Sequence, residues 1–225
     1  MLENVLDIER SAFLWLNGGH TAFWDSFMWI YSGRAVWFPA AVVILIMLIY
    51  KNKPAASLLV LLLLVLTLTA CDQFASSVCK PLFTRLRPTQ HPDFMYDVLT
   101  VNGYRGGKYG FISSHAANAF GLAVFLSMLL RNRLFTATIL IWAVIMCYSR
   151  IYLGVHFISD IVPGIAVGAL FGFIGYKLYD FIVAKLSERV GGGGITLATG
   201  RKRIIVFGIW ATMAYILIFS VLKII

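Results

Sequence analysis

Charged residues are scarce in this sequence, and acidic residues are the scarcest of them. Of the 225 residues, 13% are charged and 60% are hydrophobic. Soluble domains keep roughly a quarter of their residues charged, so this composition excludes a water-facing enzyme, a disordered tail and a coiled coil. Long apolar runs take the place of charge, and we expect the chain to lie in a lipid bilayer.

Cysteine is also rare. The three cysteines, Cys71, Cys79 and Cys147, lie inside or at the edge of apolar runs. Their spacing does not match that of metal ligands. We therefore expect small buried hydrophobic side chains rather than disulfides or zinc ligands.

Six apolar runs can cross a membrane when their polar flanks are counted. They lack the alternation that barrel strands need, so the sequence predicts an all-α fold, an integral membrane bundle of six transmembrane helices. The runs cover residues 35–50, 55–71, 116–130, 134–149, 161–176 and 204–222.

The first 32 residues differ from the rest of the chain. Apolar residues from Leu2 to Leu16 recur at helical spacing among charged ones, which is typical of an amphipathic helix in the membrane interface. The aromatic stretch 23–31 favours either an interface anchor or ordinary packing against the bundle. We expect an interfacial segment over 1–32 and a six-span domain over 33–225, with the functional motifs in 80–160.

The net charge of +9 is divided unevenly between the loops. One alternate set of loops holds ten Lys and Arg residues against two acidic residues, and the other holds nine against eight. Since Lys and Arg near span ends are retained in the cytoplasm, we expect the first set to be cytoplasmic and both termini to lie outside. The charges are spread over three short loops, so no nucleic-acid binding is expected. Residues 190–194, in the last of these loops, are typical of a flexible linker.

The outer loops contain three polar clusters, each where a predicted span meets the same face of the membrane. Buried charges cost several kcal/mol unless they are paired. Three cations beside two histidines and a carboxylate would therefore stabilise the packing of helices poorly. They would suit the binding of an oxyanion, of which phosphate is the obvious example. The residues are Lys80 and Arg87, then Ser113, Ser114 and His115, then Arg150, His156 and Asp160.

These clusters also resemble the motifs of a known family. The sequence reads K-x6-R-P over Lys80–Pro88, I-S-S-H over Ile112–His115 and S-R-x5-H-x3-D over Ser149–Asp160. It resembles the type 2 phosphatidic acid phosphatase family, which includes bacterial undecaprenyl-diphosphate, phosphatidylglycerophosphate and lipid A phosphatases. The resemblance runs from about Asp72 to Asp160. It implies metal-independent hydrolysis of the terminal phosphate of a membrane lipid phosphate or diphosphate, with no cofactor.

The resemblance implies catalytic roles for three of these residues. His156 would be the nucleophile and would form a phosphohistidine. Asp160, four residues further on, would fix the tautomer of the His156 ring. His115 would be the general acid that protonates the leaving oxygen.

The other motif residues would bind phosphate. Lys80, Arg87 and Arg150 would hold the three phosphoryl oxygens. The free backbone N–H groups of Ser113 and Ser114, at the start of a helix, would add to the same site. No metal site is expected, because Asp160 is the one carboxylate in the motif cluster and magnesium phosphatases gather several oxygen ligands.

Two positions depart from the family pattern P-S-G-H. Ile112 stands where the family has Pro, and Ser114 stands where it has Gly. If the backbone at Ser114 had a positive φ, its side chain would cost on the order of 1 kcal/mol or more in strain.

Several polar residues lie outside the motifs. Arg85, His91 and Lys108 are expected to face lipid headgroups or solvent. Asp72 is an acid inside a predicted span, where we expect a structural hydrogen bond or a contact that steadies Lys80.

The sequence thus predicts a lipid-phosphate phosphatase in a bacterial inner membrane, with its active site facing the periplasm or exterior and its substrate drawn from the bilayer. The headgroup is left open between undecaprenyl diphosphate, a phosphatidyl phosphate and lipid A. Two alternatives come from other classes. A vanadate-dependent haloperoxidase shares the anion site but oxidises halide in water. A transporter or channel would usually place a polar site near the midplane of the membrane, where Asp72 comes closest.

Overall fold

The structure is a computed structural model that describes residues 2–185 and 194–224, with side chains from residue 7 onward. Within these ranges the chain forms helices and loops without a β-strand, apart from one isolated bridge between Leu86 and Tyr109. The all-α prediction is confirmed. The three cysteines are buried and unpaired, as predicted. Most of the predicted linker over 190–194 lies outside the described residues.

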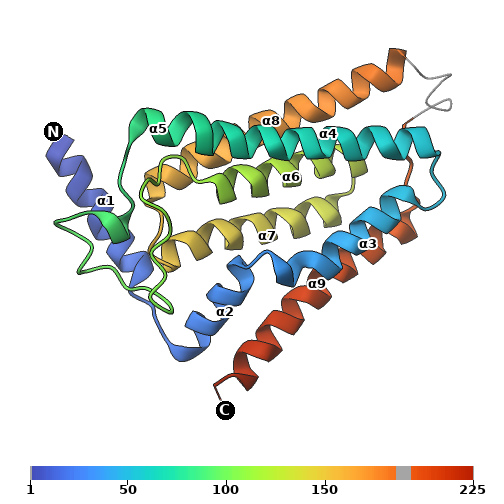
Figure 1. Cartoon of the computed structure of the whole chain (residues 1–225). Coiled ribbons are helices and arrows are strands. Elements are labelled where there is room, and N and C mark those ends of the chain that lie inside the picture. Colours follow the sequence, from blue (N-terminus) through green and yellow to red (C-terminus); the bar gives the residue numbers. More distant parts are fainter. Residues whose placement is uncertain (1, 186–193, 225) are drawn as a thin grey trace.

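Eight longer helices make up the described part of the chain, with four short helical segments between them (Figure 1). The longer helices are α1 (Leu2–Asn17), α2 (Ala22–Ser32), α3 (Phe38–Ile49), α4 (Pro54–Gln73), α6 (Ser114–Leu130), α7 (Arg133–Tyr152), α8 (Ile158–Lys185) and α9 (Thr199–Leu222). The short ones are η1 (Ala35–Trp37), the π-helical η2 (Phe74–Cys79), α5 (Lys80–Phe83) and η3 (Pro88–Gln90).

Four stretches of the described chain are long and apolar enough to cross a membrane: Pro54–Phe83, Arg133–Tyr152, Ile158–Lys185 and Thr199–Leu222. The stretches Ala22–Ser32 and Ala35–Ile49 qualify together, with a bend of 69° between them. Helix α6 is apolar but has 17 residues. The protein is therefore an integral membrane protein. Each predicted run lies in a helix, while the count of six spans stays a prediction.

Helices α6 and α8 pack so closely that two positions of α8 have room for glycine only. A Cβ on Gly168 of α8 would lie 2.2 Å from the carbonyl oxygen of Ala117, and one on Gly164 would lie 2.8 Å from that of Ser113. Small residues permit such close approach between membrane helices. The contact fixes the beginning of α6 against the first turns of α8.

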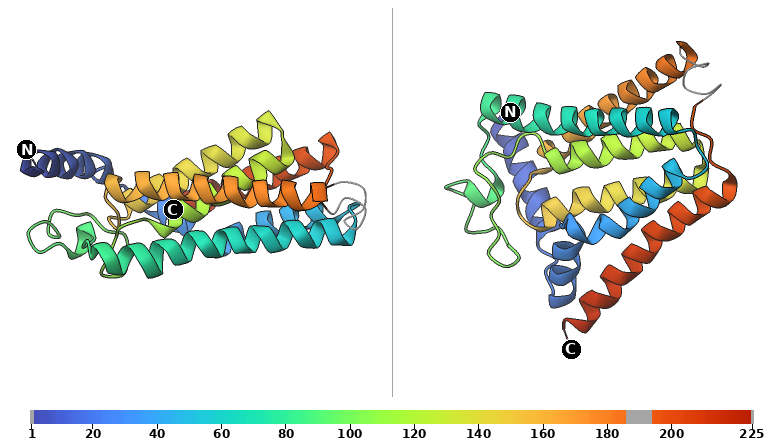
Figure 2. Two further views of the ribbon diagram at one scale, coloured as in Figure 1. Left: turned by 90° about the horizontal axis from the view of Figure 1, so that it is seen from above. Right: turned by 45° about the vertical axis from the view of Figure 1, so that its right-hand side comes forward.

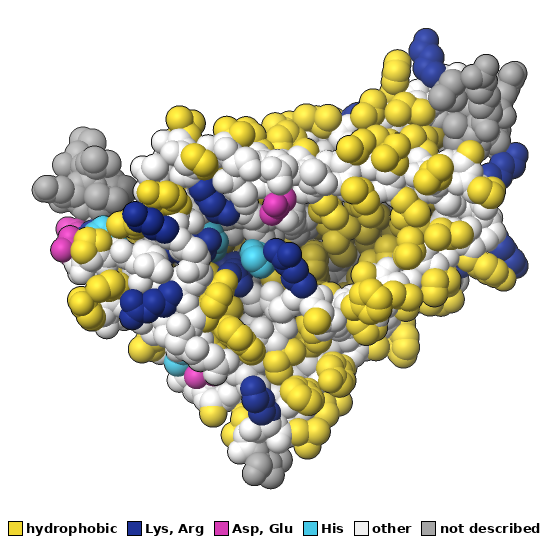
Figure 3. All heavy atoms as spheres, viewed as in Figure 1, with side chains coloured by type: hydrophobic (Ala, Val, Ile, Leu, Met, Phe, Trp, Pro, Cys, Tyr) yellow, Lys and Arg dark blue, Asp and Glu magenta, His cyan; other side chains and the backbone are white. Residues whose placement is uncertain are grey.

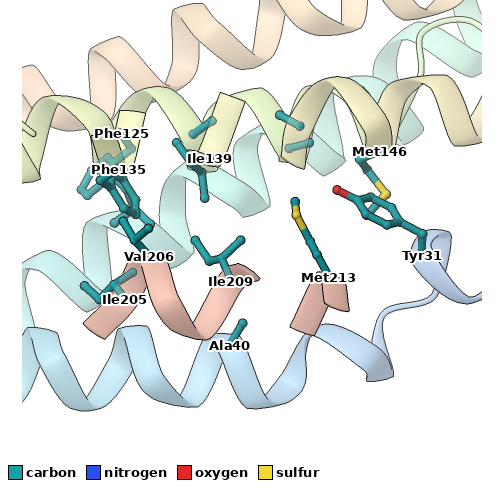
Figure 4. Packing of buried hydrophobic residues seen from close by; sticks show 14 of the residues in the cluster. Tyr31, Ala40, Phe125, Phe135, Ile139, Met146, Ile205, Val206, Ile209 and Met213 are labelled. Carbon is teal, nitrogen blue, oxygen red and sulfur yellow. The ribbon is translucent and has the colours of Figure 1, made fainter. Parts of the chain in front are cut away.

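Helix α9 packs against the same bundle from the other side. Its buried residues Ile205, Ile209 and Met213 lie between Ala40 of α3 and Ile139 of α7 (Figure 4). These side chains form one apolar core with the rest of the bundle. Helix α9 therefore holds α3 in place beside the site described below.

Helix α1 lies at the end of the bundle where α7 ends and α8 begins (Figure 2). Phe13 is fully buried, with its ring centroid 5.7 Å from that of Phe94 and 5.4 Å from that of Phe157. Ile8 and Trp15 are 69% and 81% exposed. The predicted N-terminal helix is thus present and docks on the protein by one face. Its place in the membrane interface stays a prediction, and the side chains of residues 2–6 in its predicted apolar face lie outside the description.

Helix α2 contains the aromatic stretch 23–31. Phe27, Met28 and Tyr31 are buried in the core of the bundle. Of the two expectations for this stretch, packing against the bundle is the one that the structure supports.

Four chain segments end or begin at one end of the bundle, on the left of Figure 1. They are the end of the α4–α5 stretch, the start of α6, the end of α7 and the start of α8. The first two segments carry one motif each and the last two share the third, so the fold brings the three motifs together.

Candidate active site

The motif residues surround a cavity of about 720 Å³. Histidine and cationic side chains gather around a hollow between α4 and the α2–α3 stretch (Figure 3). Of the predicted site residues, Lys80, Arg87, Ser114, His115, Arg150 and His156 line this cavity. A larger cavity of about 930 Å³, between α2–α3 and α9, contains none of them.

His156 lies in the tight turn between α7 and α8 and is 2% exposed. Gly154 makes the turn possible because its φ is +74°, and a Cβ there would lie 2.7 Å from Cγ1 of Val98. Nε2 of His156 lies 3.0 Å from Nη1 of Arg87. A guanidinium can only donate hydrogen bonds, so Nε2 must accept and the ring proton must be on Nδ1. The geometry therefore leaves a lone pair on Nε2.

Burial and charge keep this imidazole neutral. Desolvation by burial, followed by the positive charges of Arg87, Arg150 and Lys80, holds the pKa of His156 well below its usual value. Both effects disfavour the imidazolium form. A neutral imidazole with an unprotonated nitrogen is the form that can act as a nucleophile.

Asp160 is fully buried beside His156, and its two carboxylate oxygens have different hydrogen-bond partners. Oδ2 accepts the backbone N–H of Phe157 at 3.0 Å and lies 3.4 Å from Nδ1 of His156. Oδ1 accepts a hydrogen bond from Nη1 of Arg85 at 2.9 Å. Asp160 is thus placed to hold the Nδ1–H tautomer of His156.

Arg85 does not face solvent or lipid headgroups, and that prediction is wrong. Its guanidinium forms ion pairs with Asp160 at 2.9 Å and with Glu9 of α1 at 2.7 Å. It also lies over the ring of Phe157, 4.7 Å from the ring centroid. The docking of α1, which the sequence pattern did not reveal, places Glu9 within reach of Arg85.

The two buried arginines of the motifs are held in place by hydrogen bonds to other residues of the protein. Arg87 donates from Nη1 to the carbonyl oxygen of Val155 at 2.9 Å. Arg150 donates to Oγ of Ser32 and, at 3.4 Å, to the hydroxyl of Tyr104. Within the described residues, Nε of Arg87 and Nε of Arg150 are buried without a hydrogen-bond partner. Buried donors are costly to leave unpaired, and these two could serve an oxyanion in the cavity.

Lys80 follows the π-helical segment η2, a type of helical irregularity that is frequent at functional sites. Its Nζ donates to Oγ of Ser114 at 2.8 Å and to Oγ of Ser76 at 3.2 Å. The Ser114 side chain therefore anchors the ammonium group. Ser114 does not have a positive φ, so its replacement of the family glycine causes no backbone strain.

Ser113 contributes to the fold and not to the anion site. Its backbone N–H donates to the carbonyl oxygen of Asp160 at 3.0 Å, and its Oγ accepts the N–H of Ala116 at 3.4 Å. The expectation that Ser113 offers a free N–H to phosphate is wrong, because the close contact of α6 with α8 supplies an acceptor. The same hydrogen bond ties the start of α6 to Asp160.

Two further charged residues line the cavity. Arg34, at the break between α2 and α3, lines the same cavity as His115 and Arg150 and belongs to none of the three motifs. Its position directly before the first apolar run, in loops of little net charge, is the signal that could have found it. Asp72 accepts a hydrogen bond from Nδ2 of Asn118 at 3.5 Å, as expected for a structural role.

Comparison with known families and sequences agrees with this geometry. Residues 58–183 match the PAP2 superfamily, a range that contains all three motifs. A lipid A 4'-phosphatase of Porphyromonas gingivalis is 46% identical over 180 residues, which are 79% of this chain and 75% of that protein. A lipid A 4'-phosphatase of Bacteroides thetaiotaomicron is 35% identical over 224 residues, which are 99% of this chain and 100% of that protein.

Two solved structures share the fold. A transmembrane PAP2-type phosphatidylglycerolphosphate phosphatase from Bacillus subtilis has a TM-score of 0.62 and 19% identity, over 80% of this chain and 88% of that one. LpxE from Aquifex aeolicus has a TM-score of 0.51 and 24% identity, over 74% of this chain and 93% of that one. At these identities the likeness concerns the fold alone.

Proposed function

The chain belongs to the PAP2 superfamily, and from that premise we propose that it removes the 4'-phosphate of lipid A with His156 as the nucleophile. It is an integral membrane enzyme that hydrolyses a lipid phosphate. The observation that supports the nucleophile most directly is the contact of His156 Nε2 with Arg87, because it requires an unprotonated nitrogen in a cavity lined by cations.

In the first step of the proposed mechanism, the lone pair of His156 Nε2 attacks phosphorus. A P–N bond forms, and the P–O bond to the lipid breaks. The electron pair of that bond leaves with the lipid oxygen, which takes a proton from His115. In this proposal the negative charge of the bound phosphate favours the protonated form of the His115 ring, which the neighbouring cations alone would disfavour. The His156 ring keeps its Nδ1 proton and gains positive charge, which Asp160 offsets.

In the second step, water attacks the phosphorus of the phosphohistidine. His115, now neutral, takes a proton from the water as the new P–O bond forms. The P–N bond breaks, its electron pair returns to Nε2, and inorganic phosphate leaves. Lys80, Arg87 and Arg150 balance the negative charge on the phosphoryl oxygens through both steps.

Lipid A as the substrate is supported by the names of the two relatives described above. The walls of the cavity also suit a phosphate on an apolar anchor. Next to the cations, its lining includes the apolar side chains of Leu68, Leu122 and Trp142. A lipid in the bilayer could thus present its phosphate to the cations while its hydrocarbon stays among the helices.

Neither alternative gains support. A haloperoxidase that works in water would not need helices long enough to span a membrane. A transporter does not account for a neutral histidine with an oriented carboxylate partner. We propose that the enzyme lies in a bacterial inner membrane with this site on the outer face, because the loops at the other end of the bundle carry the excess of basic residues.

Phosphate release by the purified protein in detergent micelles tests this proposal. The substrates are lipid A with phosphates at both sugar positions, undecaprenyl diphosphate and phosphatidylglycerophosphate, each with and without excess EDTA. We expect the highest kcat/KM on lipid A, loss of the 4'-phosphate by mass spectrometry, and unchanged rates in EDTA. Removal of the 1-phosphate instead, or a higher kcat/KM on either other lipid, would contradict the substrate assignment. Loss of activity in EDTA that magnesium restores would contradict the mechanism.

A further inference from the structure

The N-terminal helix α1 lies before the family match of 58–183 and yet contacts Arg85, the ion-pair partner of Asp160. Oε2 of Glu9 lies 2.7 Å from Nη2 of Arg85, and Nη1 of Arg85 lies 2.9 Å from Oδ1 of Asp160. The side chains of Glu9 and Arg85 are 14% and 27% exposed, and that of Asp160 is fully buried. One guanidinium thus joins a carboxylate of α1 to the carboxylate that orients His156.

Glu9 is itself held in place by α8. Its Oε1 accepts the backbone N–H of Ser159 at 3.0 Å and a hydrogen bond from the Ser159 hydroxyl. About one turn of α1 further along, Phe13 is buried between Phe94 and Phe157. The carboxylate of Glu9 is therefore fixed beside Arg85 and is not a mobile surface group.

The charges of Glu9, Arg85 and Asp160 explain why a carboxylate on α1 would affect the reaction at His156. Asp160 paired with Arg85 alone would have no net charge, and it would do little for a positive His156 ring. Glu9 on the other side of the same guanidinium brings the group of three to a net charge of −1. A nearby negative charge favours the positively charged form of a histidine ring, which is the form present in a phosphohistidine that keeps its Nδ1 proton.

We propose that Glu9 and Arg85 are positioning residues for the phosphatase reaction, with Arg85 fixing the Asp160 carboxylate and Glu9 restoring the negative charge that Arg85 cancels. Neither lines the cavity that holds the motif cations, so both act through Asp160. The inference rests on the roles proposed above for His156 and Asp160, and not on the identity of the lipid.

The test compares Glu9→Gln with its matched control Asp7→Asn. Asp7 lies on the same helix and pairs with Arg10 at 3.9 Å, with a side chain that is 72% exposed. Gln keeps the size of Glu and can still accept from Ser159, but it removes the charge. We expect Glu9→Gln to lower kcat about 3- to 10-fold with KM nearly unchanged, since the charge acts on a ring that becomes positive after substrate binds. Asp7→Asn should leave both constants unchanged.

A double-mutant cycle separates this role from simple support of the fold. In the Asp160→Asn background, Glu9→Gln should have almost no further effect on kcat, because residues that act through one another are not additive. Glu9→Asp, which keeps the charge, should recover much of the lost rate. An equal loss of kcat with and without the Asp160 carboxylate would show that α1 only stabilises the fold, and the inference would be wrong.

Failure of the proposed function would look different. A wild-type protein that releases no phosphate from any of the lipids above would overturn the phosphatase mechanism itself. An active wild-type protein with an unaffected Glu9→Gln variant would overturn only the role given to α1.

Discussion

Gly110 lies so close to Asp160 that a Cβ on this glycine would be 2.8 Å from Oδ2, the oxygen that faces His156. The backbone N–H of Gly110 also donates to the carbonyl oxygen of Arg85 at 2.8 Å. The loop between α5 and α6 therefore closes directly over the carboxylate. A side chain at this position would compete with the Nδ1 group of His156 for the same space.

We predict that Gly110→Ala lowers kcat/KM by roughly tenfold or more, since a displaced Asp160 no longer fixes the His156 tautomer and tenfold corresponds to about 1.4 kcal/mol of transition-state stabilisation. Gly107→Ala is the matched control, because a Cβ there meets nothing within 4 Å. The measurement is phosphate release from a lipid phosphate at several substrate concentrations. Equal activity of the two variants would show that Asp160 tolerates displacement.

A second glycine tests the packing that brings the motifs together. In Gly168→Ala the new methyl group would lie 2.2 Å from the backbone oxygen of Ala117, and a backbone atom cannot move aside without shifting α6. We expect a loss of roughly 1–3 kcal/mol, the usual cost of overpacking, seen as a lower midpoint of thermal unfolding in detergent. Gly200→Ala, at a position with open space, should leave the midpoint unchanged. The same midpoint for both variants would contradict the close contact of α6 with α8.

Much of the site could be predicted from the sequence, because its cations and histidines stand at fixed spacing beside the ends of apolar runs. To place them in one site, it was enough to expect that these ends meet at one face of the membrane, which the order of the spans ensures. The residues placed in this way are Lys80, Arg87, His115, Arg150 and His156. Element type was equally clear, since long apolar runs in a bilayer must be helical.

Other features depend on contacts between segments far apart in the chain. The Ser113 N–H looked free at a helix start, but α8 supplies an acceptor that no local pattern shows. Arg85 looked like a surface residue because its partners, Glu9 and Asp160, lie 76 and 75 positions away. Arg34 lies outside the motifs and lines the cavity because the chain bends between α2 and α3.

The protonation of His156 leads to a prediction about pH. Its pKa is held well below the usual value by burial and by neighbouring cations. A lowered pKa means that the ring binds its proton only at a lower pH, so His156 should stay neutral as the pH falls through 6.5. Nitrogen-15 NMR of histidine-labelled protein, assigned with His156→Ala, should show a neutral ring with its proton on Nδ1 at pH 6. A protonated ring at that pH, or a proton on Nε2, would contradict the nucleophile assignment.

The orientation of the protein in the membrane is predicted from charge alone and can be tested separately. The probes are single cysteines in a variant that lacks Cys71, Cys79 and Cys147. Tyr96→Cys, at a position that is 83% exposed in the loop before α6, should react with an impermeant maleimide in intact cells. Arg133→Cys, at the opposite end of the bundle, should react only after lysis. The reverse pattern would overturn the assignment of the basic loops to the cytoplasm.

The two catalytic histidines should differ in how they respond to the leaving group. His156→Ala removes the atom that forms the bond to phosphorus, so it should abolish turnover of every substrate. His115→Ala removes a proton donor, and its effect should depend on how much the departing oxygen needs that proton. A lipid alkoxide needs it strongly, whereas a nitrophenolate or a phosphate leaving from a diphosphate is stable as an anion.

We therefore expect His115→Ala to lose on the order of 10²–10⁴ in rate on a lipid phosphomonoester, the usual contribution of general acid catalysis, and clearly less on nitrophenyl phosphate or a lipid diphosphate. The ratio of rates between the substrates, measured for the wild type and for the variant, isolates proton donation from any change in binding. If His115→Ala loses the same factor on all three substrates, His115 binds or positions the phosphate, and the proton must reach the leaving oxygen from another group.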